Sequence, residues 1–538
     1  MPEISSSRTG RYDAVVVGAG FGGMYMLHRL REQGLSVRVF EAGSGVGGTW
    51  FWNRYPGARC DVESVDYQFS FSEELLREWT WTERYPAQAE LLAYLNHVAD
   101  RFDLRRDIQL NTRVTGATFD EDTQFWQVET DGGDRISATY VVMATGCLSV
   151  PRTPSFTGSQ DFAGATYHTS SWPHEGVDFT GKRVAVIGTG SSGIQSIPLI
   201  AEQAEQLTVF QRTPNHSVPA GNHALGADEQ REGVERFAEK RRYATGTFTG
   251  LTLPDTGLLA NESTPEQRDA VYEERWRQGG LAMYGAFADM LVDEKANATA
   301  HEFFSAKIHE KVADPEVAEK LTPRGYPFGG KRICVDTNYF ETFNRDNVTL
   351  VDLHAEPIER ITPGGIVAGG REHAVDAVVF ATGFDAMTGA LLAMDIRGRD
   401  GRALQETWAA GPRTYLGLAV AGFPNMFLVT GPGSPSVFSN MIVSIEQHVD
   451  WITDAIERLR ADGLRLMEAD PKAEDAWVAH VNEVADSTLL PRANSWYVGA
   501  NVTGKPRIFM PYLGGVGPYR QRCDEVAAQN YDGFQLVG

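Results

Sequence analysis

Two glycine-rich turns in this chain have the residue types and spacing that bind the diphosphate of a dinucleotide. The first turn, residues 18–23, follows the apolar run at residues 14–17 and precedes a segment whose apolar residues recur at helical spacing. A second apolar run, residues 37–40, ends at Glu41. A strand, a glycine turn, a helix, a strand and an acid in this order are typical of a dinucleotide-binding unit.

The glycines of such a unit have separate tasks. Gly18 permits the tight turn, Gly20 lets the backbone approach the diphosphate, and Gly23 lets the helix and the strand pack closely. The diphosphate binds at the helix N-terminus, where free N–H groups and the helix dipole favour negative charge. Glu41, which follows Gly18 by 23 residues, would accept hydrogen bonds from a ribose diol.

The same unit occurs a second time. An apolar run, the turn at residues 188–193, a helix and a further apolar run that ends at Gln211 repeat the first unit at the same spacing. Arg212 then supplies a cation close to where the first unit has the carboxylate of Glu41. A carboxylate repels a 2′-phosphate, whereas a guanidinium can form paired hydrogen bonds with it. We therefore expect FAD at the first turn and NADPH at the second.

Composition limits the class of protein. The 538 residues carry a formal net charge of −22, which disfavours nucleic acid and anionic membrane as partners. Residues 1–10 lack an apolar signal core, and no apolar run reaches membrane-spanning length. The four cysteines lie far apart, which argues against a redox pair, a zinc site or a disulfide framework. We expect a cytoplasmic protein.

The elements that must position these turns suggest an α/β fold with two doubly wound, Rossmann-like dinucleotide-binding domains and a helical insertion. The chain is too long for one core. Two apolar runs each end in an Ala-Thr-Gly turn, and we take each as the closing strand of a nucleotide-binding sheet. The expected segments are the FAD domain at 1–150 and 385–538, the NADPH domain at 151–222 and 329–384, and the insertion at 223–328.

Three local patterns refine this picture. Residues 43–61 are dense in glycine and aromatic rings and look too irregular for a helix or strand interior, so we expect a loop packed on a flat ligand or on the surface. Residues 264–267 combine an N-cap, a proline and a capping-box glutamine. Apolar residues at helical spacing predict an amphipathic helix over 445–459, in which His448 is interpreted as a packing or capping residue.

Two longer motifs resemble those of the Baeyer–Villiger monooxygenases. Residues 162–173 match the fingerprint FxGxxxHxxxWP, and residues 47–61 match the signature GGxWxxxxYPGxxxD. Together with both glycine units, the pair at 331–332 and the Asn-Ser-Trp segment at 494–496, the resemblance extends from about residue 12 to the C-terminus. The loop at 431–441 most resembles the phenylacetone and steroid monooxygenase branch.

The resemblance implies a set of site residues. Arg332 would be the active-site arginine over the flavin, held by Asp61, whereas His168 would serve domain communication and not chemistry. The residues implied for FAD are Gly18, Gly20, Gly22, Gly23, Glu41, Thr49, Trp50, Trp52, Asp61 and Tyr67, with Met441 near the flavin ring. Those implied for NADPH are Gly188, Gly190, Ser191, Ser192, Gly193, Arg212, Thr213, Lys331 and Trp496.

The implied reaction is a Baeyer–Villiger oxidation. NADPH would reduce FAD, O₂ would give a C4a-peroxyflavin, and attack on a ketone would yield an ester or lactone. An anionic peroxide and an oxyanion both require a fixed positive charge, which Arg332 could supply and Asp61 could orient. The expected partners are O₂ and an aryl-alkyl, cyclic or steroid-like ketone, and the expected assembly is a monomer or weak homo-oligomer.

Other classes remain open at this point. An N- or S-oxygenating flavin monooxygenase would share both glycine units, but its related fingerprint lacks the Trp172-Pro173 pair. A disulfide reductase would need two closely spaced cysteines, and a non-catalytic nucleotide-sensing flavoprotein would leave the aromatic loop and Arg332 unexplained. The sequence contains no Ser-His-Asp or metal-ligand constellation.

Overall fold

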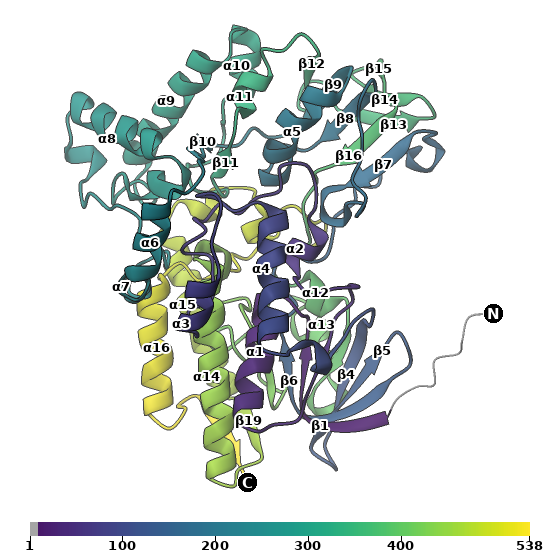
Figure 1. Cartoon of the computed structure of the whole chain (residues 1–538), viewed down its shortest axis with the longest axis vertical. Coiled ribbons are helices and arrows are strands. Elements are labelled where there is room, and N and C mark those ends of the chain that lie inside the picture. Colours follow the sequence, from purple (N-terminus) through teal and green to yellow (C-terminus); the bar gives the residue numbers. More distant parts are fainter. Residues whose placement is uncertain (1–8) are drawn as a thin grey trace.

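Two sheets, each centred on parallel strands, form the two halves of the chain (Figure 1). The computed structural model describes residues 9–538. In the first sheet, strands β3, β2, β1 and β6 run parallel, and β18 pairs with the C-terminal end of β6. A meander of β4, β5 and β6 extends the sheet to β17. The strands are β1 (Thr9–Val17), β2 (Val37–Phe40), β3 (Ile108–Gln109), β4 (Val114–Asp120), β5 (Phe125–Thr130), β6 (Arg135–Met143), β17 (Asp395–Arg397) and β18 (Met426–Leu428).

The second sheet is entirely parallel and has the order β12-β9-β8-β16-β7. Strands β12, β9, β8 and β16 follow the order 3-2-1-4, as do β3, β2, β1 and β6 of the first sheet, which confirms two doubly wound halves. Each sheet takes strands from two separate stretches of chain, while the exact domain boundaries stay a prediction. The strands are β7 (Ala165–His168), β8 (Arg183–Ile187), β9 (Gln206–Gln211), β12 (Val348–Asp352) and β16 (Ala377–Phe380).

A helix follows each glycine turn directly. Helix α1 (Phe21–Glu32) begins after Gly20, and α5 (Ser191–Gln203) begins after Gly190. Neither N-cap glycine offers a side chain to the N–H groups of the first helical turn. These donors therefore stay directed at the space beyond the carboxyl ends of the strands, where an anion can accept their hydrogen bonds.

The insertion leaves and re-enters the second half through two adjacent strands. Strands β10 (Ser217–Pro219) and β11 (Cys334–Asp336) pair in parallel. The capping box predicted at residues 264–267 is present, since Thr264 and Gln267 exchange hydrogen bonds at the start of α8. Figure 1 shows the insertion helices along the left side and top of the molecule. They are α6 (Ala227–Glu235), α7 (Phe237–Ala244), α8 (Pro265–Gln278), α9 (Glu294–Lys311) and α10 (Pro315–Leu321).

The expectation that residues 43–61 contain no helix was wrong for four residues. Helix α2 (Thr49–Trp52) forms a single turn there. Gly48 precedes it at a φ of 52°, and a Cβ on Gly48 would meet the Cα of Gly20 at 2.9 Å. The glycines allow a sharp reversal against the first turn, and burial of Trp50 and Phe51 then holds the short helix in place.

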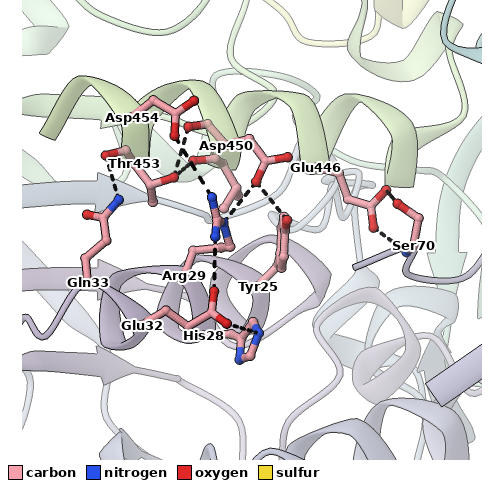
Figure 2. A network of polar contacts seen from close by, with 11 residues as sticks. Tyr25, His28, Arg29, Glu32, Gln33, Ser70, Glu446, Asp450, Thr453 and Asp454 are labelled. Carbon is pink, nitrogen blue, oxygen red and sulfur yellow. Dashed lines mark hydrogen bonds and ion pairs between the residues drawn. The ribbon is translucent and has the colours of Figure 1, made fainter. Parts of the chain in front are cut away.

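The predicted amphipathic helix is α14 (Met441–Ala461), which packs on α1. Figure 2 shows polar contacts across this interface: the Tyr25 hydroxyl and Arg29 Nε both donate to Asp450 Oδ1, at 2.7 and 3.1 Å. His448 is fully buried, and its Nδ1 accepts the Thr430 N–H at 2.8 Å. His448 thus has a packing role, as the sequence indicated.

The remaining elements complete the layers. Among residues 9–538, no helix is long and apolar enough to cross a membrane. Residues 1–8 lie outside the described residues, and they make up most of the segment in which we expected no signal core. The other α-helices and strands are α3 (Glu73–Glu78), α4 (Gln88–Arg101), α11 (Tyr339–Thr342), α12 (Gly389–Leu392), α13 (Leu404–Thr407), α15 (Pro471–Asp486), α16 (Val516–Ala528), β13 (Ile358–Thr362), β14 (Gly365–Ala368), β15 (Arg371–Ala374), β19 (Leu466–Ala469) and β20 (Phe534–Val537).

The α1–α14 contact can be tested by removing one hydroxyl. Tyr25→Phe deletes the hydrogen bond to a carboxylate and should lower the free energy of unfolding by about 1 kcal/mol. The control is Arg77→Ala, which breaks an ion pair whose side chains are 64% and 76% exposed and should cost no more than about 0.5 kcal/mol. Urea unfolding followed by circular dichroism measures both, and equal midpoints would contradict the assignment.

Candidate active site

A single cavity of about 880 Å³ lies against both glycine turns. Every site residue named from the sequence lines this cavity except Gly23 and Gly193. These two glycines hold each turn against its helix, because a Cβ there would lie 1.8 Å from the Gly18 carbonyl oxygen or 2.2 Å from that of Gly188. The fold therefore places the predicted FAD and NADPH residues around the same cavity.

The first turn is closed by the acid that follows β2. Glu41 is 5% exposed, and its two carboxylate oxygens accept the N–H groups of Ala19 and Gly43, each at 2.7 Å. Gly18 has a φ of +103°, where a side chain would be strained. Glu41 thus lines the cavity and also fixes the loop around the turn, a structural role that the motif did not indicate.

The second turn repeats this geometry with one difference. Gly188 has a φ of +112°, close to that of Gly18. A Cβ on Gly190, however, would meet no protein atom within 4 Å. The cavity is therefore open directly above the Gly190 backbone, where a ligand can approach the N-terminus of α5.

Two cations stand beside the second turn. Arg212 is exposed, and Lys331 Nζ donates to the Asn494 carbonyl oxygen at 3.2 Å. Burial, together with the positive charge of Arg212, lowers the pKa of Lys331 to about 8. Within residues 9–538 no carboxylate forms an ion pair with either side chain. This end of the cavity is therefore suited to an anionic group.

Arg332 and Asp61 are in contact although 271 residues separate them. Arg332 Nε donates to Asp61 Oδ2 at 2.8 Å, and Nη1 donates to the Val437 carbonyl oxygen at 2.7 Å. The side chains are 19% and 27% exposed. Burial alone would lower the pKa of Arg332, but the Asp61 carboxylate more than offsets this and holds the pKa above its ordinary value. Arg332 therefore remains a guanidinium at any working pH.

An apolar cluster adjoins Arg332. Val437, whose carbonyl oxygen accepts from Arg332, packs in one cluster with Cys147, Leu148 and Met441, and all four line the cavity. The four cysteines are buried and free. In the described part of the chain, no three His, Cys, Asp or Glu side chains are grouped to hold a metal ion. The space beside the guanidinium is thus suited to a neutral apolar molecule with one polar group.

Sequence reasoning missed several cavity residues. The Val437 carbonyl orients Arg332, and Asn215 Nδ2 donates to the Arg332 carbonyl oxygen at 3.3 Å. Arg152 adds a cation to the cavity wall. A backbone carbonyl gives no sequence signal, and neither Asn215 nor Arg152 falls within a motif. His168 lies outside the cavity lining and contacts the Arg152 carbonyl oxygen at 3.2 Å.

Comparison with known proteins gives matches over the whole chain. Residues 15–224 match the family described as "Pyridine nucleotide-disulphide oxidoreductase". An acetone monooxygenase (methyl acetate-forming) of Gordonia sp. is 46% identical, with 97% of this chain and 99% of the relative covered. A Baeyer-Villiger monooxygenase of Pseudooceanicola batsensis is 45% identical over 97% and 95% of the two chains.

Two further matches bear on the reaction. The phenazine N-monooxygenase PhzNO1 of Lysobacter antibioticus is 42% identical over 98% of this chain and 97% of its own. The solved structure of an oxidized steroid monooxygenase bound to NADP is 55% identical, with a TM-score of 0.94 and coverage of 98% and 99%. With identities well above 30% over nearly complete chains, this protein belongs to the Baeyer–Villiger monooxygenases, the FAD- and NADPH-dependent flavoenzymes that convert ketones to esters or lactones.

Proposed function

We propose that this enzyme oxidises neutral, apolar ketones of the aryl-alkyl, cyclic or steroid-like type, with Arg332 as the catalytic cation and Asp61 as its orienting partner. The observation that carries the proposal is the largely buried Arg332 guanidinium, held by two acceptors beside the apolar cluster of Val437, in a cavity that both glycine turns line. A panel of such ketones with product identification tests the substrate class.

The residues fit the two cofactors. The open space above Gly190 and the uncapped start of α5 suit a diphosphate, while Arg212 and Lys331 suit the 2′-phosphate of NADPH. At the first turn, Glu41 suits a plain ribose. The residues proposed to hold FAD are Gly18, Gly20, Gly22, Gly23, Glu41, Thr49, Trp50, Trp52, Asp61, Tyr67, Met441 and Arg332. Those proposed to hold NADPH are Gly188, Gly190, Ser191, Ser192, Gly193, Arg212, Thr213, Lys331 and Trp496.

When bound, NADPH and FAD supply the electrons and the activation of O₂. Arg332 binds the ketone oxygen and stabilises the negative charge that develops there, because its own charge is fixed and its position is set by Asp61 and Val437. Asp61 partly neutralises the guanidinium, so that the site stabilises the transient negative charge on the ketone oxygen without binding it too tightly. The apolar cluster excludes water around this contact.

Oxygenation of a ring nitrogen is a second candidate activity. A phenazine N-monooxygenase covers this chain at 42% identity. Oxygenation of a nitrogen forms no negative charge on a carbonyl oxygen, so the fixed cation Arg332 favours the ketone. Adding a phenazine to the ketone panel separates the two activities.

The setting of the enzyme is also proposed. The four free, buried cysteines suit a reducing cytoplasm, and we expect a monomer or weak homo-oligomer. Size-exclusion chromatography with light scattering measures the latter.

The glycine assignment gives a matched pair of variants. Gly190→Ala adds a methyl group that touches no protein atom, so it should leave the melting temperature near wild type but weaken NADP⁺ binding about tenfold or more. Gly193→Ala forces the turn to move and should lower the melting temperature itself. Tight NADP⁺ binding by Gly190→Ala, measured by titration calorimetry, would exclude a diphosphate at this turn.

The role of Arg332 predicts a split between two half-reactions. Arg332→Ala should still bleach the flavin absorbance with NADPH under nitrogen, whereas ester formation should fall about 100-fold or more. Arg332→Lys keeps a charge but loses the fork that reaches both acceptors, so its activity should be intermediate. Gas chromatography measures the ester, and a wild-type yield from Arg332→Ala would remove this residue from the mechanism.

Lys331 predicts a pH dependence of coenzyme binding. Its pKa of about 8 lies below the ordinary lysine value, so the contact with a phosphate is present at neutral pH and is lost as pH rises through 8. The dissociation constant of NADP⁺ should therefore rise above pH 8, by up to about tenfold per unit. Lys331→Arg should flatten the curve, and NAD⁺ should show no such rise; the same rise in Lys331→Arg would assign it elsewhere.

A further inference from the structure

Arg152 is a cation of the cavity wall for which neither the sequence motifs nor the proposed mechanism accounts. Its backbone lies beside the turn that follows β16, where its N–H donates to the Gly383 carbonyl oxygen at 2.9 Å and Pro151 bridges to Phe384. The same cavity is lined by the second glycine turn and by Arg212. Arg152 therefore lies near Arg212 in the cavity, although its segment of the chain belongs to neither glycine motif.

The charges around Arg152 are unbalanced. Burial lowers the pKa of Arg152, and the charge of nearby Arg212 lowers it further. No aspartate or glutamate of residues 9–538 forms an ion pair with either guanidinium. The repulsion between these two like charges disfavours the empty site. A bound anion with several oxygens would relieve this repulsion.

His168 fixes the backbone from which Arg152 projects. The ring is 8% exposed, and burial lowers its pKa, so it is neutral at pH 7. Its Nδ1 accepts the Ser170 N–H at 3.1 Å, so the proton is on Nε2. Nε2 then donates to the Arg152 carbonyl oxygen at 3.2 Å, and the Thr382 hydroxyl donates to the same oxygen at 2.5 Å.

We propose that Arg152 binds a phosphate group of NADP(H) together with Arg212, and that His168 positions Arg152 for this contact. The inference rests on the proposed function only in placing the dinucleotide at the second turn. Arg152 is a specificity-determining residue for the coenzyme, while His168 acts through it as a positioning residue.

The test measures dissociation constants by titration calorimetry on the FAD-loaded protein, with NADP⁺, NAD⁺ and adenosine 2′,5′-bisphosphate as probes. Arg152→Gln should weaken NADP⁺ binding about tenfold, which corresponds to the loss of one charge-assisted contact. Arg212→Gln serves as comparator. Arg113→Gln removes a charge from the same cavity next to Thr112, whose N–H donates to the Glu41 carbonyl oxygen at 2.8 Å. This variant should leave NADP⁺ binding within about twofold, since distant charges are screened.

The three probes identify the phosphate. Weaker binding of NADP⁺ and the bisphosphate but not of NAD⁺ supports a contact with the 2′-phosphate, whereas equal weakening of NADP⁺ and NAD⁺ supports a contact with the diphosphate. Unchanged binding of all probes by Arg152→Gln, with Arg212→Gln still weakened, overturns the inference and leaves the proposed function intact. A wild-type protein that binds no NADP⁺ overturns both.

The positioning role is tested by a double-mutant cycle. His168→Phe should weaken NADP⁺ binding about as much as Arg152→Gln, and the double variant should be no weaker than either single variant. His168→Gln can still donate from its amide to the Arg152 carbonyl oxygen, so it should restore most of the affinity. Additive losses, or no rescue by His168→Gln, would show that His168 does not act through Arg152.

Discussion

The contact between Arg332 and Asp61 is the constraint on which the site depends. A guanidinium removed from bulk water is unfavourable unless its donors are paired, and here a carboxylate and a backbone carbonyl accept from it. Asp61 ends the aromatic segment of the first half, whereas Arg332 lies two residues before β11, the strand through which the chain returns from the insertion. The contact can form only when both parts are folded and packed together, so the position of this guanidinium depends on the assembly of both halves.

An acidic protein that binds anionic cofactors must concentrate its positive charge locally. The net charge of −22 would repel a dinucleotide at a distance. Near the second turn, however, Arg212, Lys331 and Arg152 have no acidic partners within residues 9–538. At the first turn the situation is reversed, because Glu41 is buried and satisfied by backbone N–H groups. The two turns have a similar backbone at their first glycine and differ in the charge beside them, and this difference is the basis of the coenzyme assignment that we propose.

The sequence predicts features whose interacting residues are close in the chain, and it does not predict contacts between distant residues. The glycine units, the capping box at Thr264 and the stripe of α14 are encoded within a few neighbouring residues, and the sequence predicted all three. The contact of Arg332 with Asp61 depends on packing across 271 residues and was available only through family resemblance. Arg152 lies outside every motif. The short helix α2 escaped prediction because tertiary burial of aromatic rings, and not local propensity, stabilises it.

The parallel pairing of β10 with β11 has a consequence for how this architecture tolerates variation in length. Both crossings of the chain lie side by side, Ser217 opposite Cys334 and Pro219 opposite Asp336. Loops between residues 227 and 321 can therefore change in length without separating the two ends of the insertion, provided that Tyr284, whose hydroxyl accepts the Ile333 N–H at 3.4 Å, keeps its place. Changes of length in the insertion thus need not move the segment that carries Arg332, and the insertion contributes no residue to the lining of the cavity.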